Sequence, residues 1–197
     1  DKALERERSA RRHAEERQQQ LDILVRASEV LASSLDYETT LQNVAKLLVK
    51  ELADWCAIDL IGDGSIDRVA VEHLEPEKKQ LAIELQKKYP QTFDETTAFG
   101  RVFTTGEPLL FEEIDPAMIR DSVRTEEHLK LIRELGLESA MVLPLRIRGE
   151  TIGTLTLVSE DAQRHFSTDD LSLTQELAHH AALAVEESRH YTQMEKL

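Results

Sequence analysis

The chain has 197 residues, with 38 acidic and 24 basic side chains and a formal net charge of −14. This length suits one domain with appended segments, and a hydrophobic content of 41% is enough to build a core, which excludes wholesale disorder. An acidic body disfavours nucleic acid as a partner, because polyphosphate binding relies on Lys and Arg. No stretch approaches the run of about 18 apolar residues that a membrane-spanning helix needs, so we expect no membrane segment.

Cysteine, glycine and proline usage bears on compartment and architecture. The one cysteine, Cys56, has no internal disulfide partner, and the charged N-terminal residues do not resemble a secretory signal, so we expect a cytoplasmic protein. All seven glycines and all five prolines lie between Gly62 and Gly153. Because these residues interrupt helices, we expect long helices on either side of a compact mixed core.

The N-terminal segment, residues 1–34, is predicted to be one helix rich in Glu, Arg, Gln and Ala. Its second half carries a near-heptad seam that favours a coiled coil, formed by Leu21, Leu24, Ser28, Leu31 and Leu35. Asp36 is predicted to cap a second helix that ends near Ala53.

The middle of the chain is predicted to begin with a hairpin. Its two strands are Trp55–Ile61 and Ile66–Leu74, joined by a glycine-containing turn. Pro76 then begins a helix that ends before Pro90. The following stretch is less regular, and there we expect a short helix at Ala98–Thr105 and a strand at Pro108–Glu112.

The rest of the chain is predicted as helix, hairpin and helix. An amphipathic helix is expected over Arg124–Leu135, followed by the strands Ser139–Ile147 and Thr151–Ser159. The last helix begins after the N-cap Ser167 and is expected to run to Leu197.

This order of elements predicts an α+β fold, an α/β sandwich with a mostly antiparallel sheet of about five or six strands. Hairpins at both ends of the strand series argue against parallel crossovers. We expect the long terminal helices to cover one face of the sheet. Short helices and loops would then roof a pocket on the other face, where a small molecule would bind.

Several sequence runs resemble the GAF domain family, and the resemblance extends over about residues 21–191. The runs that carry it are Leu31-Ala32-Ser33-Ser34-Leu35-Asp36, Ala53-Asp54-Trp55-Cys56-Ala57-Ile58-Asp59, Thr105-Gly106-Glu107-Pro108, Ser139-Ala140-Met141-Val142-Leu143-Pro144-Leu145, Phe166-Ser167-Thr168-Asp169-Asp170-Leu171 and Ala181-Ala182-Leu183-Ala184-Val185-Glu186. They are similar to GAF domains of bacterial multi-sensor histidine kinases and of sporulation-type phosphatase regulators. The resemblance implies a non-catalytic sensory module, a homodimer through its N- and C-terminal helices, that passes the state of a ligand or partner to an output domain.

With this resemblance the chain divides into three segments. Residues 1–34 form a signalling or coiled-coil helix, residues 35–166 form the GAF sensor core, and residues 167–197 form the C-terminal helix and output connector. The net charge of the whole chain argues against nucleic acid as a partner, although residues 1–20 carry six basic and five acidic side chains.

Enzymatic and cofactor-bearing alternatives were compared with the residues that each needs. His179-His180 lacks the sequence context of a phosphorylated kinase histidine, and free methionine sulfoxide reductases of GAF fold use several cysteines, whereas Cys56 stands alone. Haem needs one axial histidine, which His73 or His128 could supply, so a haem or small-metabolite sensor stays an alternative. Covalent bilin and cyclic nucleotide binding lack their signature residues, and the identity of any cofactor stays unknown.

Strand alternation selects the candidate pocket residues. In the first strand Asp59 is expected to face the roof, and a carboxylate within an apolar strand needs a partner. The candidates for the ligand pocket are Asp59, His73, Phe99, Arg101, Phe103, His128, Met141 and Thr154. We expect no catalytic residue and no metal ligand.

Overall fold

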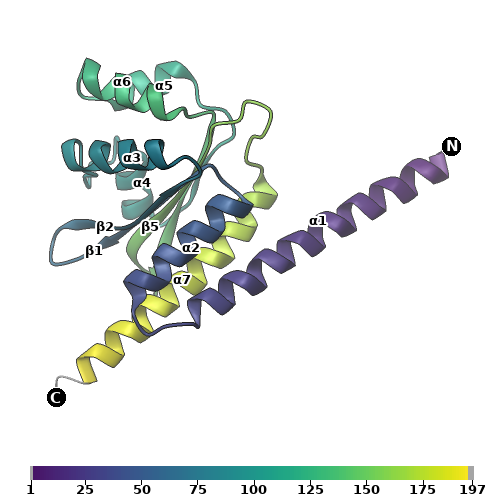
Figure 1. Ribbon diagram of the computed structural model, residues 1–197, viewed down its shortest axis with the longest axis horizontal. Coiled ribbons are helices and arrows are strands. Elements are labelled where there is room, and N and C mark those ends of the chain that lie inside the picture. Colours follow the sequence, from purple (N-terminus) through teal and green to yellow (C-terminus); the bar gives the residue numbers. More distant parts are fainter. Residues whose placement is uncertain (1, 195–197) are drawn as a thin grey trace.

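The computed structural model describes residues 2–194 and shows a single sheet between two layers of helices, with one helix projecting away from the body (Figure 1). The helices of the described part are α1 (Lys2–Leu31), α2 (Tyr37–Glu51), α3 (Pro76–Lys88), α4 (Ala98–Thr105), α5 (Pro116–Ser122), α6 (Glu126–Leu135) and α7 (Thr168–Met194). Its strands are β1 (Trp55–Ile61), β2 (Ile66–His73), β3 (Leu109–Phe111), β4 (Ser139–Ile147) and β5 (Glu150–Ser159).

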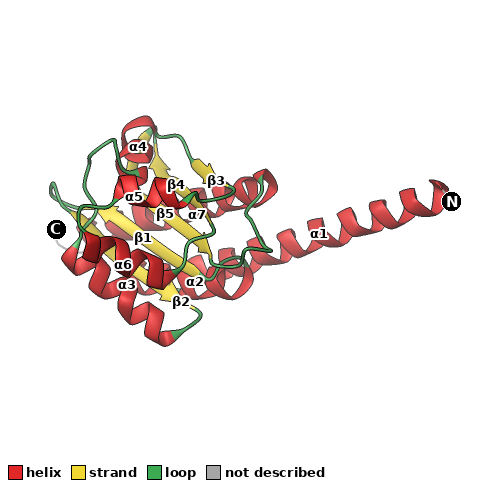
Figure 2. Cartoon of the chain, turned by 90° about the horizontal axis from the view of Figure 1, so that it is seen from above, coloured by secondary structure: helices red, strands yellow, loops and turns green. Residues whose placement is uncertain are grey.

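The sheet follows the order β2-β1-β5-β4-β3, and every neighbouring pair is antiparallel. The helices α3 to α6 lie over one face of this sheet (Figure 2). The α+β fold with an antiparallel sheet is therefore confirmed, with five strands in the described residues.

The main core lies between the sheet and the layer of α1, α2 and α7. Cys56, Ile58 and Leu60 of β1 are buried in it together with Leu48 of α2 and Leu177 of α7. Because side chains alternate along a strand, the intervening residues of β1 face the opposite helical layer. This is the alternation expected from the sequence.

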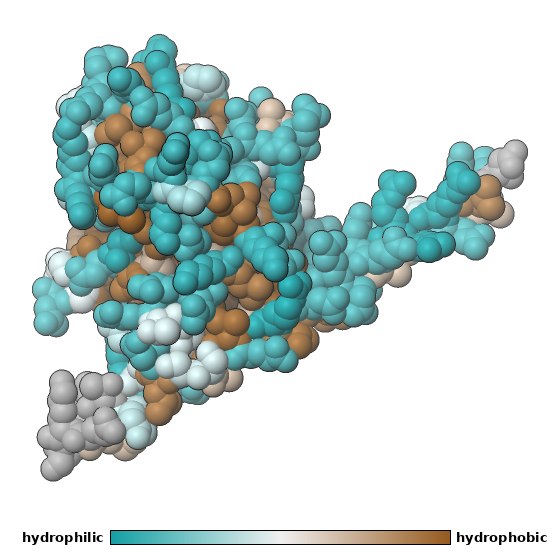
Figure 3. All heavy atoms as spheres, in the orientation of Figure 1, coloured by the Kyte–Doolittle hydropathy of each residue, from teal (hydrophilic) through white to brown (hydrophobic). Residues whose placement is uncertain are grey.

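The predicted seam of α1 contributes only in part to packing within the chain. Ile23, Ala27 and Leu31 are its buried residues, while Leu21 and Leu35 of the predicted seam are 51% and 59% exposed. A spacing of four residues places Ile23, Ala27 and Leu31 on the side of α1 that packs against α2 and α7. Of the predicted seam, Leu31 is therefore buried and Leu24 is half-buried, while Leu21 stays exposed. The first half of α1 projects from the body and is mostly hydrophilic (Figures 1 and 3).

One further difference is a short helix, and the start of the last helix agrees with the prediction. The short helix α5 was not predicted, although Asp115 caps it by accepting a hydrogen bond from the Ala117 amide at 2.8 Å. The last helix begins as expected, with a reciprocal Ser167–Asp170 capping box. Its predicted continuation over residues 195–197 lies outside the described residues. No helix in the described part of the chain is both long and apolar enough to cross a membrane.

Candidate ligand-binding site

A cavity of about 380 Å³ lies on the face of the sheet opposite α1, α2 and α7. All five strands contribute side chains to its floor: Trp55, Arg68, Phe111, Ala140, Val142, Thr156 and Val158. The helices α3 to α6 form its roof, mainly with Leu85, Tyr89, Phe99, Met118, His128 and Ile132. A largely apolar cavity with a few convergent polar groups is typical of a small-molecule site.

Three of the eight predicted pocket residues line this cavity: Phe99, Arg101 and His128. Phe99 and Arg101 come from α4, which begins at the N-cap Thr97 and ends at Gly106. Gly106 adopts a φ of 67°, which favours glycine, so the short helix stops where the chain must turn back to the sheet.

Asp59 is fully buried and binds a cavity residue without lining the cavity itself. Its carboxylate accepts two hydrogen bonds from Arg68, at 2.9 Å from Nε and 3.0 Å from Nη2. The two residues are register partners in the β1–β2 pair, so the hairpin itself brings them together. The bidentate pair orients the Arg68 guanidinium at the cavity floor, and its charge is balanced there.

The charged side chains that line the cavity are all basic. Arg68, Arg101 and Arg124 line it, and no Asp or Glu does so among the described residues. The guanidinium groups of Arg101 and Arg124 form no ion pair within residues 2–194, unlike that of Arg68. Positive charge therefore collects at this cavity in a chain whose net charge is −14.

An aromatic pair forms one flat wall. The rings of Tyr89 and His128 stack with centroids 4.1 Å apart and planes 3° apart. Thr125 holds both residues, because its hydroxyl contacts the Tyr89 hydroxyl at 2.9 Å and accepts a hydrogen bond from the His128 amide. Burial, and then the positive charge of Arg124, lower the pKa of His128. The imidazole is therefore mostly neutral at pH 7.

Two buried polar atoms of the cavity lining lack a hydrogen-bond partner among the described residues. They are Nε1 of Trp55, on the floor, and Oγ1 of Thr92, in the loop before α4. Buried polar groups in proteins are nearly always satisfied, and a ligand is one way to satisfy them.

His73 was a predicted pocket residue, but it lies in a separate polar cluster. Its Nδ1 accepts a hydrogen bond from the Glu75 amide at 2.9 Å, and its Nε2 contacts the carboxylate of Glu160. Lys78 contacts the other oxygen of that carboxylate. Both ring nitrogens of His73 are therefore occupied. The cluster joins the start of α3 to the end of β5.

The other three predicted residues also lie away from the cavity lining. Phe103 packs on Phe93, with ring centroids 4.9 Å apart. Met141 points into the main core against the terminal helices, because it alternates with Ala140 and Val142 of the floor. Thr154 is fully buried beside Asp59, its register partner on β1, and its hydroxyl has no partner in the described residues.

Sequence reasoning missed several cavity residues, notably Trp55, Arg68, Tyr89 and Arg124. A signal existed for Arg68, since the buried carboxylate of Asp59 required a partner and hairpin pairing placed Arg68 opposite it. Tyr89 and Arg124 carry no such signal, because loops and helices far apart in the chain bring them to the cavity.

The structure bears on the cofactor alternatives. Both nitrogens of His73 are engaged, which leaves Nε2 of His128 as the imidazole atom of the cavity lining available to an axial site. Cys56 is fully buried on the other face of the sheet, and burial raises the pKa of its thiol. A buried thiol with a raised pKa is a poor nucleophile. The described residues contain no cluster of three or more His, Cys, Asp or Glu that could hold a metal ion.

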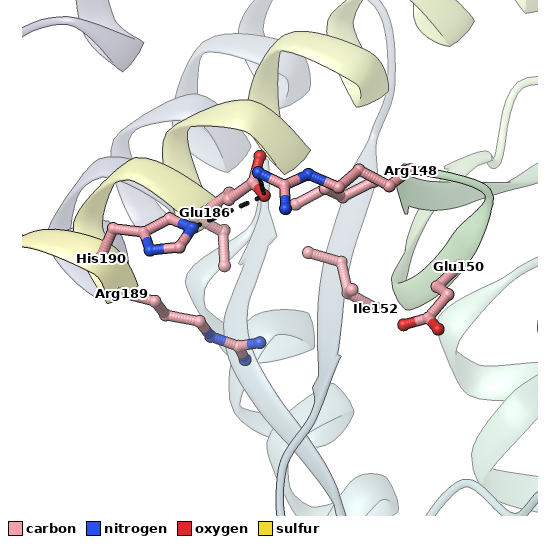
Figure 4. Close-up of a pocket in the computed structure, with 8 residues that line it drawn as sticks. Arg148, Glu150, Ile152, Glu186, Arg189 and His190 are labelled. Carbon is pink, nitrogen blue, oxygen red and sulfur yellow. Dashed lines mark ion pairs between the residues drawn. The ribbon is translucent and has the colours of Figure 1, made fainter. Parts of the chain in front are cut away.

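A second cavity, of about 370 Å³, lies between the tip of the β4–β5 hairpin and α7 (Figure 4). Arg148 at the tip forms an ion pair of 3.0 Å with Glu186 of α7, and His190 lies 3.7 Å from the same carboxylate. Arg148 has a φ of 51°, which is unusual for a residue other than glycine. The hairpin tip is thereby attached to the C-terminal helix.

The geometry defines a class of protein, an α+β domain with a cavity on one face of its sheet and long terminal helices on the other. The sequence profile of the GAF domain family matches residues 36–185, and the chain belongs to that family. The expected resemblance is thus confirmed. Comparison with curated protein sequences gives no match.

Solved structures share this fold at low sequence identity. The GAF domain of a phosphoenolpyruvate-protein phosphotransferase from Coxiella burnetii is 21% identical, with a TM-score of 0.69, covering 89% of this chain and 98% of that one. Free methionine-R-sulfoxide reductase from Neisseria meningitidis is 21% identical, with a TM-score of 0.64 and coverage of 87% and 91%. The GAF domain of a protein described as a sensor histidine kinase, from Pseudomonas syringae pv. tomato, is 20% identical, with a TM-score of 0.62 and coverage of 94% and 99%.

Proposed function

We propose that this GAF domain is a non-catalytic sensory module of a cytoplasmic bacterial signal-transduction protein, of the sensor histidine kinase kind. The observation that carries the proposal is the cavity of about 380 Å³ with a mostly apolar lining and unpartnered polar atoms. The inaccessibility of Cys56 supports a binding role over thiol chemistry.

The strands offer a direct path from ligand to helices. Ala140 and Val142 of β4 line the cavity, while Met141 and Leu143, which alternate with them, are buried in the main core, where β4 packs against α7. A close-packed core transmits small displacements, so a ligand that shifts β4 also shifts α7. The ion pair between Arg148 and Glu186 adds a second link from the β4–β5 hairpin to α7.

The terminal helices suit a homodimer. Leu21 and Val25 of α1 are 51% and 57% exposed, and Leu35 just after it is 59% exposed. The first half of α1 has no buried residue, and an isolated helix of that length is only marginally stable in water. A second copy of α1 would cover these apolar side chains and stabilise the projecting half.

Sedimentation velocity tests this dimer. We expect a dimer for the whole chain and a monomer for the variant Leu21→Glu, Val25→Glu, because two carboxylates would have to be buried in the seam. The exchange Ser9→Glu, Gln19→Glu adds the same charge at exposed positions of α1 on the side away from Leu21 and Val25, and it is the matched control. A whole chain that sediments as a monomer contradicts the dimer.

Native mass spectrometry of protein purified from its own host tests ligand binding. We expect a bound small molecule on the natural chain and none on Thr156→Phe, which fills the cavity floor. Ala140→Leu narrows the same cavity from β4, so the test does not depend on correct folding of Thr156→Phe alone. Thr104→Phe, on an exposed position of α4 outside the cavity lining, is the control and retains the molecule. No bound molecule on the natural chain, or equal retention by the cavity variants, would refute the binding proposal.

A further inference from the structure

We propose that the cavity selects an anionic small molecule, with a carboxylate, sulfonate or phosphate group on a flat apolar body. Arg101 and Arg124 would attract the anionic group, and the aromatic walls would hold the body. This inference rests on the proposed function and names the ligand class of the same site.

The distribution of charge is the first support. Asp and Glu make up 38 of the 197 residues, yet none of the described residues that line the cavity is acidic. Apolar cavities exclude charge of both signs, but this one admits three arginines. A lining that lacks acidic side chains but keeps basic ones favours a negatively charged ligand.

The balance of the three arginines is the second support. Asp59 accepts two hydrogen bonds from Arg68, at 2.9 and 3.0 Å. The carboxylate therefore neutralises most of the charge of Arg68 and holds its guanidinium group in a fixed orientation. Arg101 and Arg124 have no carboxylate within ion-pair distance in the described part of the chain, and both residues are exposed. Hydrogen bonds from Thr96 and, to a smaller extent, the positive charge of Arg124 lower the pKa of Asp94, so the charge of Arg124 is partly compensated. The positive charge that no ion pair neutralises therefore belongs to these two residues, and mainly to Arg101.

The shape of the lining is the third support. Tyr89 and His128 present parallel rings, and Trp55, Phe99 and Phe111 add aromatic surface to the cavity. Such surfaces favour flat apolar groups. The unpartnered Nε1 of Trp55 is a hydrogen-bond donor only, so it requires an acceptor, which an anion or a carbonyl group provides.

A pair of fluorescent probes separates the anion from the apolar body. The sulfonate 1-anilinonaphthalene-8-sulfonate and the neutral N-phenyl-1-naphthylamine share one ring system and differ in the anionic group. We expect the whole chain to bind the sulfonate at least tenfold more tightly than the neutral probe. Arg101→Gln, Arg124→Gln should remove most of this preference while leaving the affinity for the neutral probe unchanged.

Three variants control the measurement. Arg133→Gln removes an exposed arginine of α6 that does not line the cavity, and it should keep the preference. Arg101→Lys, Arg124→Lys keeps the charge and should keep most of the preference, whereas misfolding would lower the affinity for both probes. Thr156→Phe fills the cavity and should weaken both probes, which locates their binding there.

The possible outcomes distinguish this inference from the proposed function. If the neutral probe binds in the cavity but the sulfonate has no advantage, or keeps its advantage in the glutamine variant, the anion inference is overturned and the sensory pocket stands. If neither probe binds and the protein from its own host carries no molecule, both proposals fail.

Discussion

The pairing of Asp59 with Arg68 leads to a quantitative prediction about stability. The Asp59 side chain is 1% exposed and that of Arg68 is 10% exposed, so removing one charge leaves the other without compensation inside the sheet. Breaking a buried pair in this way costs about 3–5 kcal/mol. We expect Asp59→Asn to lower the free energy of unfolding by that amount, because the amide keeps the volume but loses the charge and one acceptor.

Two further variants distinguish the effect of the lost charge from the effect of changed packing. In Asp59→Leu, Arg68→Met both charges are replaced by apolar groups, and such replacements are often neutral, so we expect this variant to regain most of the lost stability. Glu134→Gln removes a carboxylate from the exposed pair with Lys130 and should leave the unfolding midpoint unchanged. Urea unfolding followed by circular dichroism gives all four free energies. A loss below about 1 kcal/mol in Asp59→Asn, the range of exposed ion pairs, would refute the reasoning.

Three other predictions concern a close approach, a buried thiol and a histidine. Gly153→Ala places a Cβ 2.2 Å from the Asp59 carbonyl oxygen, so β1 and β5 must move apart. We expect the free energy of unfolding in urea to fall by at least about 2 kcal/mol. An unchanged unfolding midpoint would contradict the contact. Cys56 should react with a thiol reagent only when the domain opens, so rapid labelling of the native protein would disprove its burial. The NMR titration of His128 should have its midpoint below 6.5 because burial lowers the pKa. The unfolded chain then takes up this proton first, so the contribution of His128 to stability is complete above pH 6.5 and is lost as the pH falls toward the folded-state pKa; a midpoint above 6.5 would contradict this.

Local signals account for most elements that were predicted correctly. Asp36 accepts hydrogen bonds from the amides of Glu38 and Thr39, and Ser167 and Asp170 cap each other, so side chains within a few residues set where α2 and α7 begin. The helix α5 was missed because seven residues carry too short a pattern, even with Asp115 and Pro116 at its start.

The candidate site was predicted only in part. Phe99, Arg101 and His128 line the cavity, whereas His73 and Met141 do not. Met141 lies on the core face because β4 runs through the sheet with Ala140 and Val142 turned toward the cavity. The sequence pattern of β4 is apolar on both faces, so alternation alone does not say which face is which.

The sequence by itself determined the antiparallel α+β architecture, the family and the acidic surface, because periodicity, capping residues and composition act locally or over the whole chain. It also required a partner for the carboxylate of Asp59. Only the tertiary structure decided that Arg68 is this partner, that His73 binds Glu160, and that the cavity is lined by arginines without an acidic residue among the described positions. These features depend on which distant segments meet across the sheet, and packing sets that choice.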